Sequence, residues 1–125
     1  MCAAFDAYLE AARWQVGDLV YVACHPALAP RFVWCLPVEC NVRTANGQDG
    51  ADLALLAQAA PEFVARRAGR LVIGSGDGDF IARAVAAREL GVGVLVVARP
   101  DATNSGWRAH GFPVRPLVAP LRDAA

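Results

Sequence analysis

Residues 71–80, which read Leu-Val-Ile-Gly-Ser-Gly-Asp-Gly-Asp-Phe, place the tightest constraint on the fold. The first three are apolar and predict a short strand that is buried on both faces. Three glycines at alternating positions then let the backbone turn sharply and approach its neighbours closely. A segment with helical periodicity begins at Phe80, so Asp77 and Asp79 lie on a strand-to-helix turn. In open α/β sheets ligands bind at this place, the carboxyl end of a parallel strand.

The glycines suggest a dinucleotide-binding turn, but the pattern does not fit. Gly74 and Gly76 match the first two glycines of G-x-G-x-x-G, whereas the third position is Asp79. Carboxylates beside a pyrophosphate would repel it unless a cation lay between them. Because Mg²⁺ takes carboxylate and phosphate oxygens as ligands, Asp77 and Asp79 favour a divalent metal site. An alternative stays open, in which Asp77 caps the helix and Asp79 interacts with the helix dipole.

The composition is typical of one globular domain, residues 1–125. More than half of the residues, 56%, are hydrophobic, which is enough for a sizeable core. No apolar run approaches the roughly 18 residues of a membrane span, and the start does not resemble a signal peptide. We therefore expect a cytoplasmic protein with reduced cysteines and no membrane contact. The alternative of a zinc site at Cys24, His25, Cys35 and Cys40 lacks the usual close Cys-x-x-Cys pair.

Arginine supplies all 12 basic residues, and these balance 12 acidic residues. The zero net charge argues against a protein that coats nucleic acid by charge alone, but not against an enzyme that touches a few phosphates. Arg43, Arg99 and Arg108 lie near predicted strand ends and are candidate phosphate contacts. For each of them an ordinary solvated arginine is the simpler interpretation.

Strands alternate with helices along the chain, which predicts a layered α/β fold with a parallel sheet. Asp52 opens the helix expected at residues 51–66, which has a core stripe that includes Leu53 and Phe63. If the strands are close, Asp52, Asp77 and Asp79 converge at one edge, where a cation would offset their repulsion. The other expected helices cover residues 3–15, 27–36, 80–90 and 101–110, and the expected strands cover residues 19–24, 38–44, 70–73, 92–98 and, at an edge, 114–118.

Residues 75–80 (Ser-Gly-Asp-Gly-Asp-Phe) resemble the signature of NYN domains, a branch of the PIN-like nucleases. Residues 50–55 (Gly-Ala-Asp-Leu-Ala-Leu) are similar to the segment that opens the preceding helix in that family, and the spacing between the two segments agrees. The resemblance covers about residues 19–117. It implies a Rossmann-like, PIN-like α/β/α sandwich with a mostly parallel sheet, and a metal-dependent ribonuclease.

The resemblance also implies a set of site residues. Asp52, Asp77 and Asp79 would be the catalytic residues and would bind Mg²⁺ or Mn²⁺. The ion would activate a water that attacks an RNA phosphodiester, and it would stabilise charge on the phosphate. The candidates for RNA binding are Ser75, Arg43, Asn104 and Ser105.

Two features depart from the family pattern. An Asp that precedes an aromatic residue near the end of the family's domains is absent here or replaced by His110. The Asp-bearing strand that usually opens the domain and lies mid-sheet is also missing. A start placed too far downstream or a fragment explains this better than a lost acid and lost activity, because a missing central strand leaves two halves of a sheet unpaired. We expect either a gap between the strands at 19–24 and 71–73 or their direct pairing, and an open edge favours a homodimer.

Two other functions compete with the nuclease. The first is a non-catalytic module on the same fold that binds RNA or a protein, because the geometry for hydrolysis is demanding and one acid is missing. The second is a nucleotide-binding or small-molecule-binding α/β protein, which rests on Gly74 and Gly76 alone.

Overall fold

The structure is a computed structural model that describes residues 2–24, 26–27, 30, 40–47, 50–58 and 60–117. At residues 2–4, 24, 52 and 58 it describes the backbone alone. Most of the short helix expected at residues 27–36 lies outside the described residues, as do two of the four candidate zinc ligands, His25 and Cys35. Cys40 is half-buried, and burial raises the pKa of its thiol.

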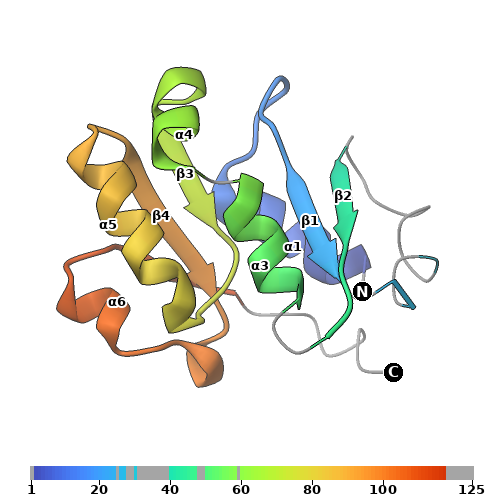
Figure 1. Ribbon diagram of the computed structural model, residues 1–125. Helices are drawn as coiled ribbons and strands as arrows, with labels where there is room; N and C mark the ends of the chain where they lie inside the picture. Colours follow the sequence, from blue (N-terminus) through green and yellow to red (C-terminus); the bar gives the residue numbers. More distant parts are fainter. Residues whose placement is uncertain are drawn as a thin grey trace.

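The described strands form two parallel sheets, as expected for an α/β fold (Figure 1). The smaller sheet pairs β1 (Tyr21–Cys24) with β2 (Asn41–Thr44), and Val22 lies opposite Val42. The larger sheet has the order β3 (Arg70–Ile73), β4 (Gly93–Ala98) and β5 (Val114–Pro116). The arrows of β1, β3 and β4 in Figure 1 point toward one end of the molecule, and β2 and β5 run parallel to their neighbours, so the carboxyl ends share an edge. β5 is an edge strand, as its prolines predict.

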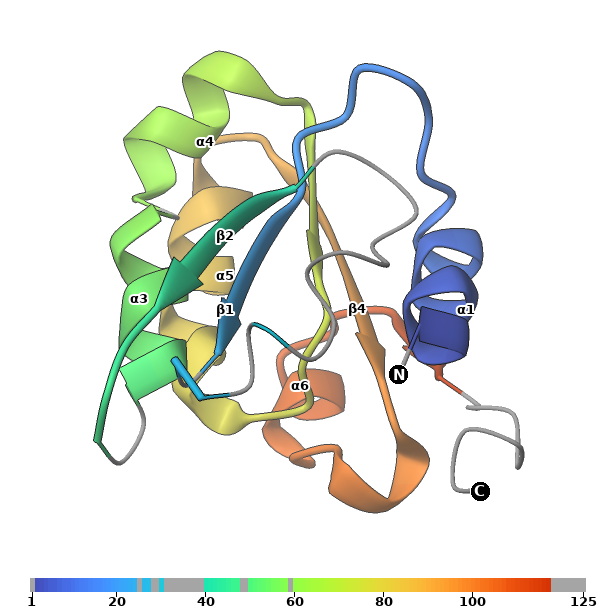
Figure 2. The same ribbon diagram turned by 90° about the vertical axis from the view of Figure 1, so that its right-hand side faces the viewer.

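A gap separates the two sheets among the described strands, which confirms one of the two expected arrangements. β1 is the strand of the smaller sheet that lies toward β3, yet the two strands are not paired (Figures 1 and 2). No described strand lies between them. The prediction that β3 is buried on both faces was wrong, because Leu71, Val72 and Ile73 are only half-buried. β4 covers β3 on one side, and no described strand flanks it on the other.

The helices cover both sides of the strands (Figure 2). α1 (Cys2–Ala12) lies on one side, whereas α3 (Gly50–Gln58), α4 (Pro61–Arg67) and α5 (Ile81–Glu89) lie on the other. The short helix α6 (Gly106–Ala109) lies near the carboxyl edge. The described residues also form the 3₁₀ turns η2 (Gly78–Phe80) and η3 (Pro100–Ala102). No described helix combines the length and apolarity that crossing a bilayer requires.

Helix α1 ends at Ala12, earlier than the expected end at residue 15. Arg13 adopts a left-handed backbone with φ of 57°, and its N–H donates to the carbonyl of Glu10. The N–H of Trp14 donates to the carbonyl of Leu9, which completes a Schellman motif. Two arginines of the larger sheet satisfy the last two carbonyls: Arg70 donates to Ala12 and Arg115 donates to Ala11. The end of α1 is therefore fixed by partners that are distant in the sequence.

The single helix expected at residues 51–66 is instead two helices, α3 and α4. Pro61 is the first residue of α4, and Ala60 before it is extended, with ψ of 129°. A proline inside a helix clashes with the preceding turn and disfavours helical backbone at the residue before it, so the helix breaks here. The expected core stripe was wrong in part: Leu53 is 62% exposed and Phe63 is 37% exposed, whereas Val64 is buried.

The hydrophobic core lies around the larger sheet. Val96 and Val97 of β4 and Trp107 of α6 have no exposed surface. Ala84 and Ala87 of α5 pack into the core cluster, and their separation of three residues places them on one face of the helix. Gly91 follows α5 with φ of 89°, a left-handed conformation that glycine adopts readily after a helix C-terminus.

Candidate functional site

The turn after β3 is held by hydrogen bonds within itself. Ser75 Oγ accepts from the N–H of Asp77 at 3.1 Å. Asp77 Oδ1 in turn accepts from the N–H of Asp79 at 2.9 Å, so Asp77 is the N-cap of η2. The capping alternative is thus confirmed for Asp77, and Asp79 lies in the first turn that follows.

Neighbouring atoms leave little room for a side chain at any of the three glycines of the turn. Gly74, Gly76 and Gly78 all have ordinary backbone angles, without a positive φ. A Cβ at Gly76 would collide with the backbone carbonyl of Ala102, and a Cβ at Gly78 would meet Asn104 Nδ2 at 2.7 Å. At Gly74 the side chain of Tyr8 occupies the space. The close approach that the sequence predicted is therefore observed on all sides of the turn.

A second loop, which follows β4, supports the acidic turn. Asn104 N–H donates to the carbonyl of Gly76 at 2.8 Å, and Trp107 Nε1 donates to the same carbonyl at 3.2 Å. The side chain of Asn104 is itself fixed, because its Oδ1 accepts from the N–H of Gly106 at 2.7 Å. Asn104 therefore braces the turn through its backbone and through contact with Gly78.

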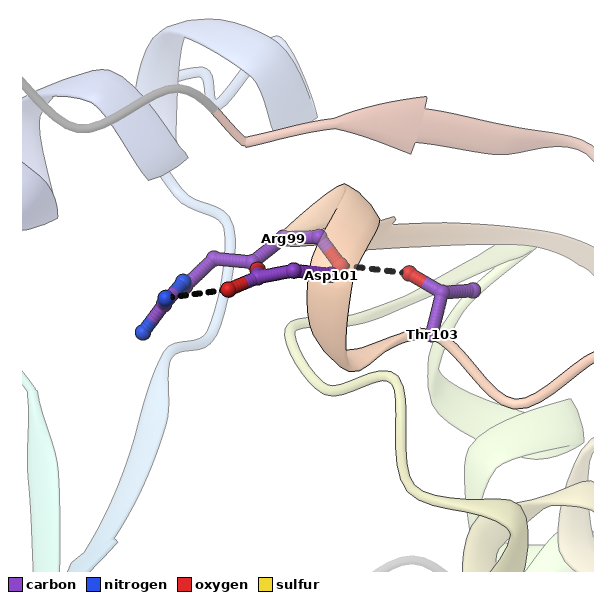
Figure 3. Close-up of polar contacts among 3 residues, drawn as sticks. All are labelled: Arg99, Asp101 and Thr103. Atoms are coloured by element: carbon purple, nitrogen blue, oxygen red, sulfur yellow. Dashed lines mark hydrogen bonds and ion pairs between the residues drawn. The ribbon is translucent and has the colours of Figure 1, made fainter.

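The start of this second loop carries an ion pair at the same edge of the sheet (Figure 3). Arg99 Nη2 lies 2.7 Å from Asp101 Oδ2, and both side chains are about two-thirds exposed. The hydroxyl of Thr103 donates to the carbonyl of Arg99 at 2.6 Å. The Arg99 guanidinium thus already has a carboxylate partner, which weakens its candidacy as a phosphate contact.

Asp77 and Asp79 present oxygens that suit a hard cation. Both residues are exposed. Among the described residues, Asp77 Oδ2 and both carboxylate oxygens of Asp79 accept no hydrogen bond. Mg²⁺ and Mn²⁺ bind one or two carboxylates and fill their remaining positions with water or phosphate oxygens. The donor set of this turn therefore fits such an ion.

Asp52 lies in the first turn of α3, as expected, and the structure describes its backbone only. Figure 1 shows that α3 begins at the edge toward which the strands point, the edge that also carries the acidic turn. The structure thus brings Asp77 and Asp79 together and places the backbone of Asp52 at the same edge. Among the described side chains, no group of three or more His, Cys, Asp or Glu residues could hold a metal ion.

The other predicted contacts are spread over several elements. Arg43 is exposed on β2, where its Nη1 donates to the carbonyl of Val42 at 3.4 Å. Ser105 is exposed at the start of α6, and its side chain makes no capping hydrogen bond. Arg108 is exposed within α6, and His110 is exposed at its end.

Sequence reasoning missed two aromatic residues that contact the turn. Trp107 reaches Gly76 from 31 residues away, and Tyr8 packs against Gly74 from α1. Burial raises the pKa of the Tyr8 hydroxyl, and the nearby charge of Arg70 opposes part of that rise. The sequence shows only that the chain has both large aromatic side chains and glycines that leave space for them. It does not identify which glycine each aromatic residue contacts.

Comparison with known proteins adds no relative to these observations. No protein-family model, no curated protein and no solved structure matches this chain. The function of this chain is therefore inferred from its residues and their geometry.

Proposed function

We propose that this protein is a metal-dependent ribonuclease that hydrolyses RNA phosphodiester bonds, on a PIN-like form of the α/β fold. One observation carries the proposal. Two exposed carboxylates, Asp77 and Asp79, lie on a firmly held turn at the carboxyl edge of parallel strands. The resemblance of residues 75–80 to NYN domains supports the same assignment.

Asp77, Asp79 and Asp52 would hold the Mg²⁺ or Mn²⁺ ion. When bound, such an ion supplies positive charge beside an RNA phosphate and promotes the ionisation of water. Within the turn, the hydrogen bond from Asp79 N–H occupies Asp77 Oδ1 and leaves Oδ2 for the ion. The exposed side chains of Arg43 and Ser105 are accessible to phosphate oxygens of a bound RNA strand.

A second candidate function is a non-catalytic module that binds RNA or a protein. The observation in its favour is the N-cap at Asp77, since this carboxylate has a structural role that requires no metal. An acidic turn that serves to start a helix would persist in a protein without catalytic activity.

Cleavage of a labelled single-stranded RNA in Mn²⁺ tests the proposal, with Asp77→Asn as the decisive variant. An asparagine still accepts the Asp79 N–H, so the variant should keep its stability to within about 0.5 kcal/mol while it loses the metal-binding charge. Asp101→Asn is the matched control, because it removes an exposed carboxylate from the same edge. We expect cleavage by the unaltered protein and by Asp101→Asn, and none by Asp77→Asn.

Cleavage that persists in Asp77→Asn would rule out the proposed site. An absence of cleavage by all three proteins would favour the non-catalytic module. In that case, binding of the same RNA is measured by fluorescence anisotropy. Binding would identify an RNA-binding module, and an absence of binding would favour a module that binds a protein.

A further inference from the structure

Trp107 contacts the acidic turn in a way that ordinary core packing does not require. We propose that the Trp107 indole N–H is a positioning group, which fixes the peptide group between Gly76 and Asp77 and thereby aims the Asp77 carboxylate. This inference rests on the proposed metal site. It adds a residue of α6 that holds the site without touching the ion.

The peptide group between Gly76 and Asp77 is held at both ends. Its carbonyl accepts from Asn104 N–H at 2.8 Å and from Trp107 Nε1 at 3.2 Å. Its N–H donates to Ser75 Oγ at 3.1 Å. A peptide group is planar and rotates as one unit, so rotation of this plane changes φ of Asp77 and redirects its side chain. Three hydrogen bonds therefore set where the Asp77 carboxylate points.

Among these three donors and acceptors, the indole has the most rigid support. The Trp107 side chain has no exposed surface and belongs to the hydrophobic core cluster. Its ring meets Phe112 edge to face, with centroids 5.5 Å apart and planes at 72°. Ser75, in contrast, is half-buried on the turn itself. A site is aimed most accurately by groups that packing already immobilises.

A variant that lacks this hydrogen bond but keeps an aromatic ring distinguishes a positioning role of Trp107 from a packing role. Phenylalanine fills much of the indole's space but has no N–H. The Gly76 carbonyl would keep its bond from Asn104, so no buried acceptor is orphaned in Trp107→Phe. The core and the turn should therefore keep their structure, and only the orientation of the Asp77 carboxylate should become less well defined.

Mn²⁺ titration by calorimetry measures the effect on the site. We expect Trp107→Phe to bind Mn²⁺ about five-fold more weakly than the unaltered protein, in line with the loss of one hydrogen bond. Phe112→Leu is the control, because it disturbs the same aromatic contact and leaves the indole N–H in place. It should lower the melting temperature without changing the affinity for Mn²⁺.

A spectroscopic test uses the unaltered sequence labelled with 5-fluorotryptophan. The fluorine resonances are assigned with Trp14→Phe and Trp34→Phe, and Mg²⁺ is then added. We expect the Trp107 resonance to shift with saturation, because its indole is bonded to the peptide that adjoins Asp77, and the Trp14 resonance to stay in place.

Each outcome decides the inference. Equal Mn²⁺ affinity in Trp107→Phe and the unaltered protein, equal weakening in Trp107→Phe and Phe112→Leu, or an unmoved Trp107 resonance would overturn it and leave the proposed metal site intact. An unaltered protein that binds neither ion would overturn the metal site and this inference together.

Discussion

The larger and the smaller sheet have the same parallel pairing but very different burial. In β4 every residue after Gly93 is buried, including Val96 and Val97. In β2 no residue is buried, and only Val42 is half-buried. β4, the central strand of the larger sheet, is thus part of a packed core, whereas β2 is an exposed edge. Parallel hydrogen bonding alone does not make a core, because a strand also needs apolar side chains with helices over both faces.

The smaller sheet depends on helices for its attachment to the rest of the molecule. α3 packs on β1 and β2, and α1 packs on β4 of the larger sheet before the chain enters β1. Arg70 and Arg115 fix the end of α1 from β3 and β5. We therefore expect the smaller sheet to open at a lower free energy than the larger one.

The largest contrast between the two regions is expected for glycine substitutions. Gly76→Ala should destabilise the protein by about 3 kcal/mol, because the new methyl group collides with the backbone at Ala102. Gly47→Ala, just after β2, should cost about 1 kcal/mol, since it has open space and only its φ of 89° is unfavourable. Urea unfolding measures both. Similar losses for the two variants would contradict the contrast.

Core truncation gives the next largest contrast. Val96→Ala removes fully buried methyl groups from β4 and should cost about 2 kcal/mol of unfolding free energy. Val42→Ala in β2 removes half-buried ones and should cost less than about 1 kcal/mol. Thermal and urea unfolding of the pair test this. An equal cost would mean that β2 is packed as tightly as β4.

The link between the two regions can be loosened at Arg115. Arg115→Ala removes a hydrogen bond to the carbonyl of Ala11 in the last turn of α1, and we expect a loss of about 1 kcal/mol. Arg99→Ala breaks only an exposed ion pair and should cost less than about 0.5 kcal/mol. Hydrogen exchange in β1 should also rise in Arg115→Ala. Unchanged exchange there would show that α1 does not attach the smaller sheet.

The smallest effect is expected at alkaline pH. Burial raises the pKa of Tyr8 above its ordinary value of 10.0, so the folded protein holds this proton more tightly than the unfolded chain. The contribution of Tyr8 to the free energy of unfolding is complete below pH 10, the ordinary pKa that applies in the unfolded chain. It is lost as the pH rises from there through the higher pKa of the folded protein. Tyr8→Phe should match the unaltered protein at pH 7 and lose less stability between pH 10 and pH 11. Identical pH profiles would contradict a buried Tyr8.

Local patterns in the sequence predicted the parts of the fold that depend on local chemistry. The apolar runs at β3 and β4 and the spacing of Ala84 and Ala87 gave strands and a helix in the correct order. The cap at Asp77 was also predictable, since the acceptor and its donor lie two residues apart. The break at Pro61 also has a local cause in the proline, but the apolar periodicity at residues 51–66 continues across it and predicts a single helix.

The remaining features depend on contacts between distant residues. Arg13 ends α1 in a left-handed conformation that is typical of glycine, and the carbonyls there are satisfied by arginines from two strands of the larger sheet. Trp107 and Gly76 meet only because β3 and β4 are neighbours. A single sequence shows which residues need a hydrogen-bond or packing partner, but not which partner the fold provides. The contacts that hold the candidate site were therefore identified only from the structure.

The parallel pairing of every described strand also bears on how the chain folds. About twenty residues separate the paired positions in each of the three ladders, so no ladder can form as a local hairpin. Each requires a loop to close before its hydrogen bonds offset the lost chain entropy. The unit β3–α5–β4 buries Ala84, Ala87 and Val96 as it closes. We therefore expect the folding nucleus to form in this unit and β1 and β2 to join after the transition state, which gives low φ-values at Val42 and high ones at Ala84.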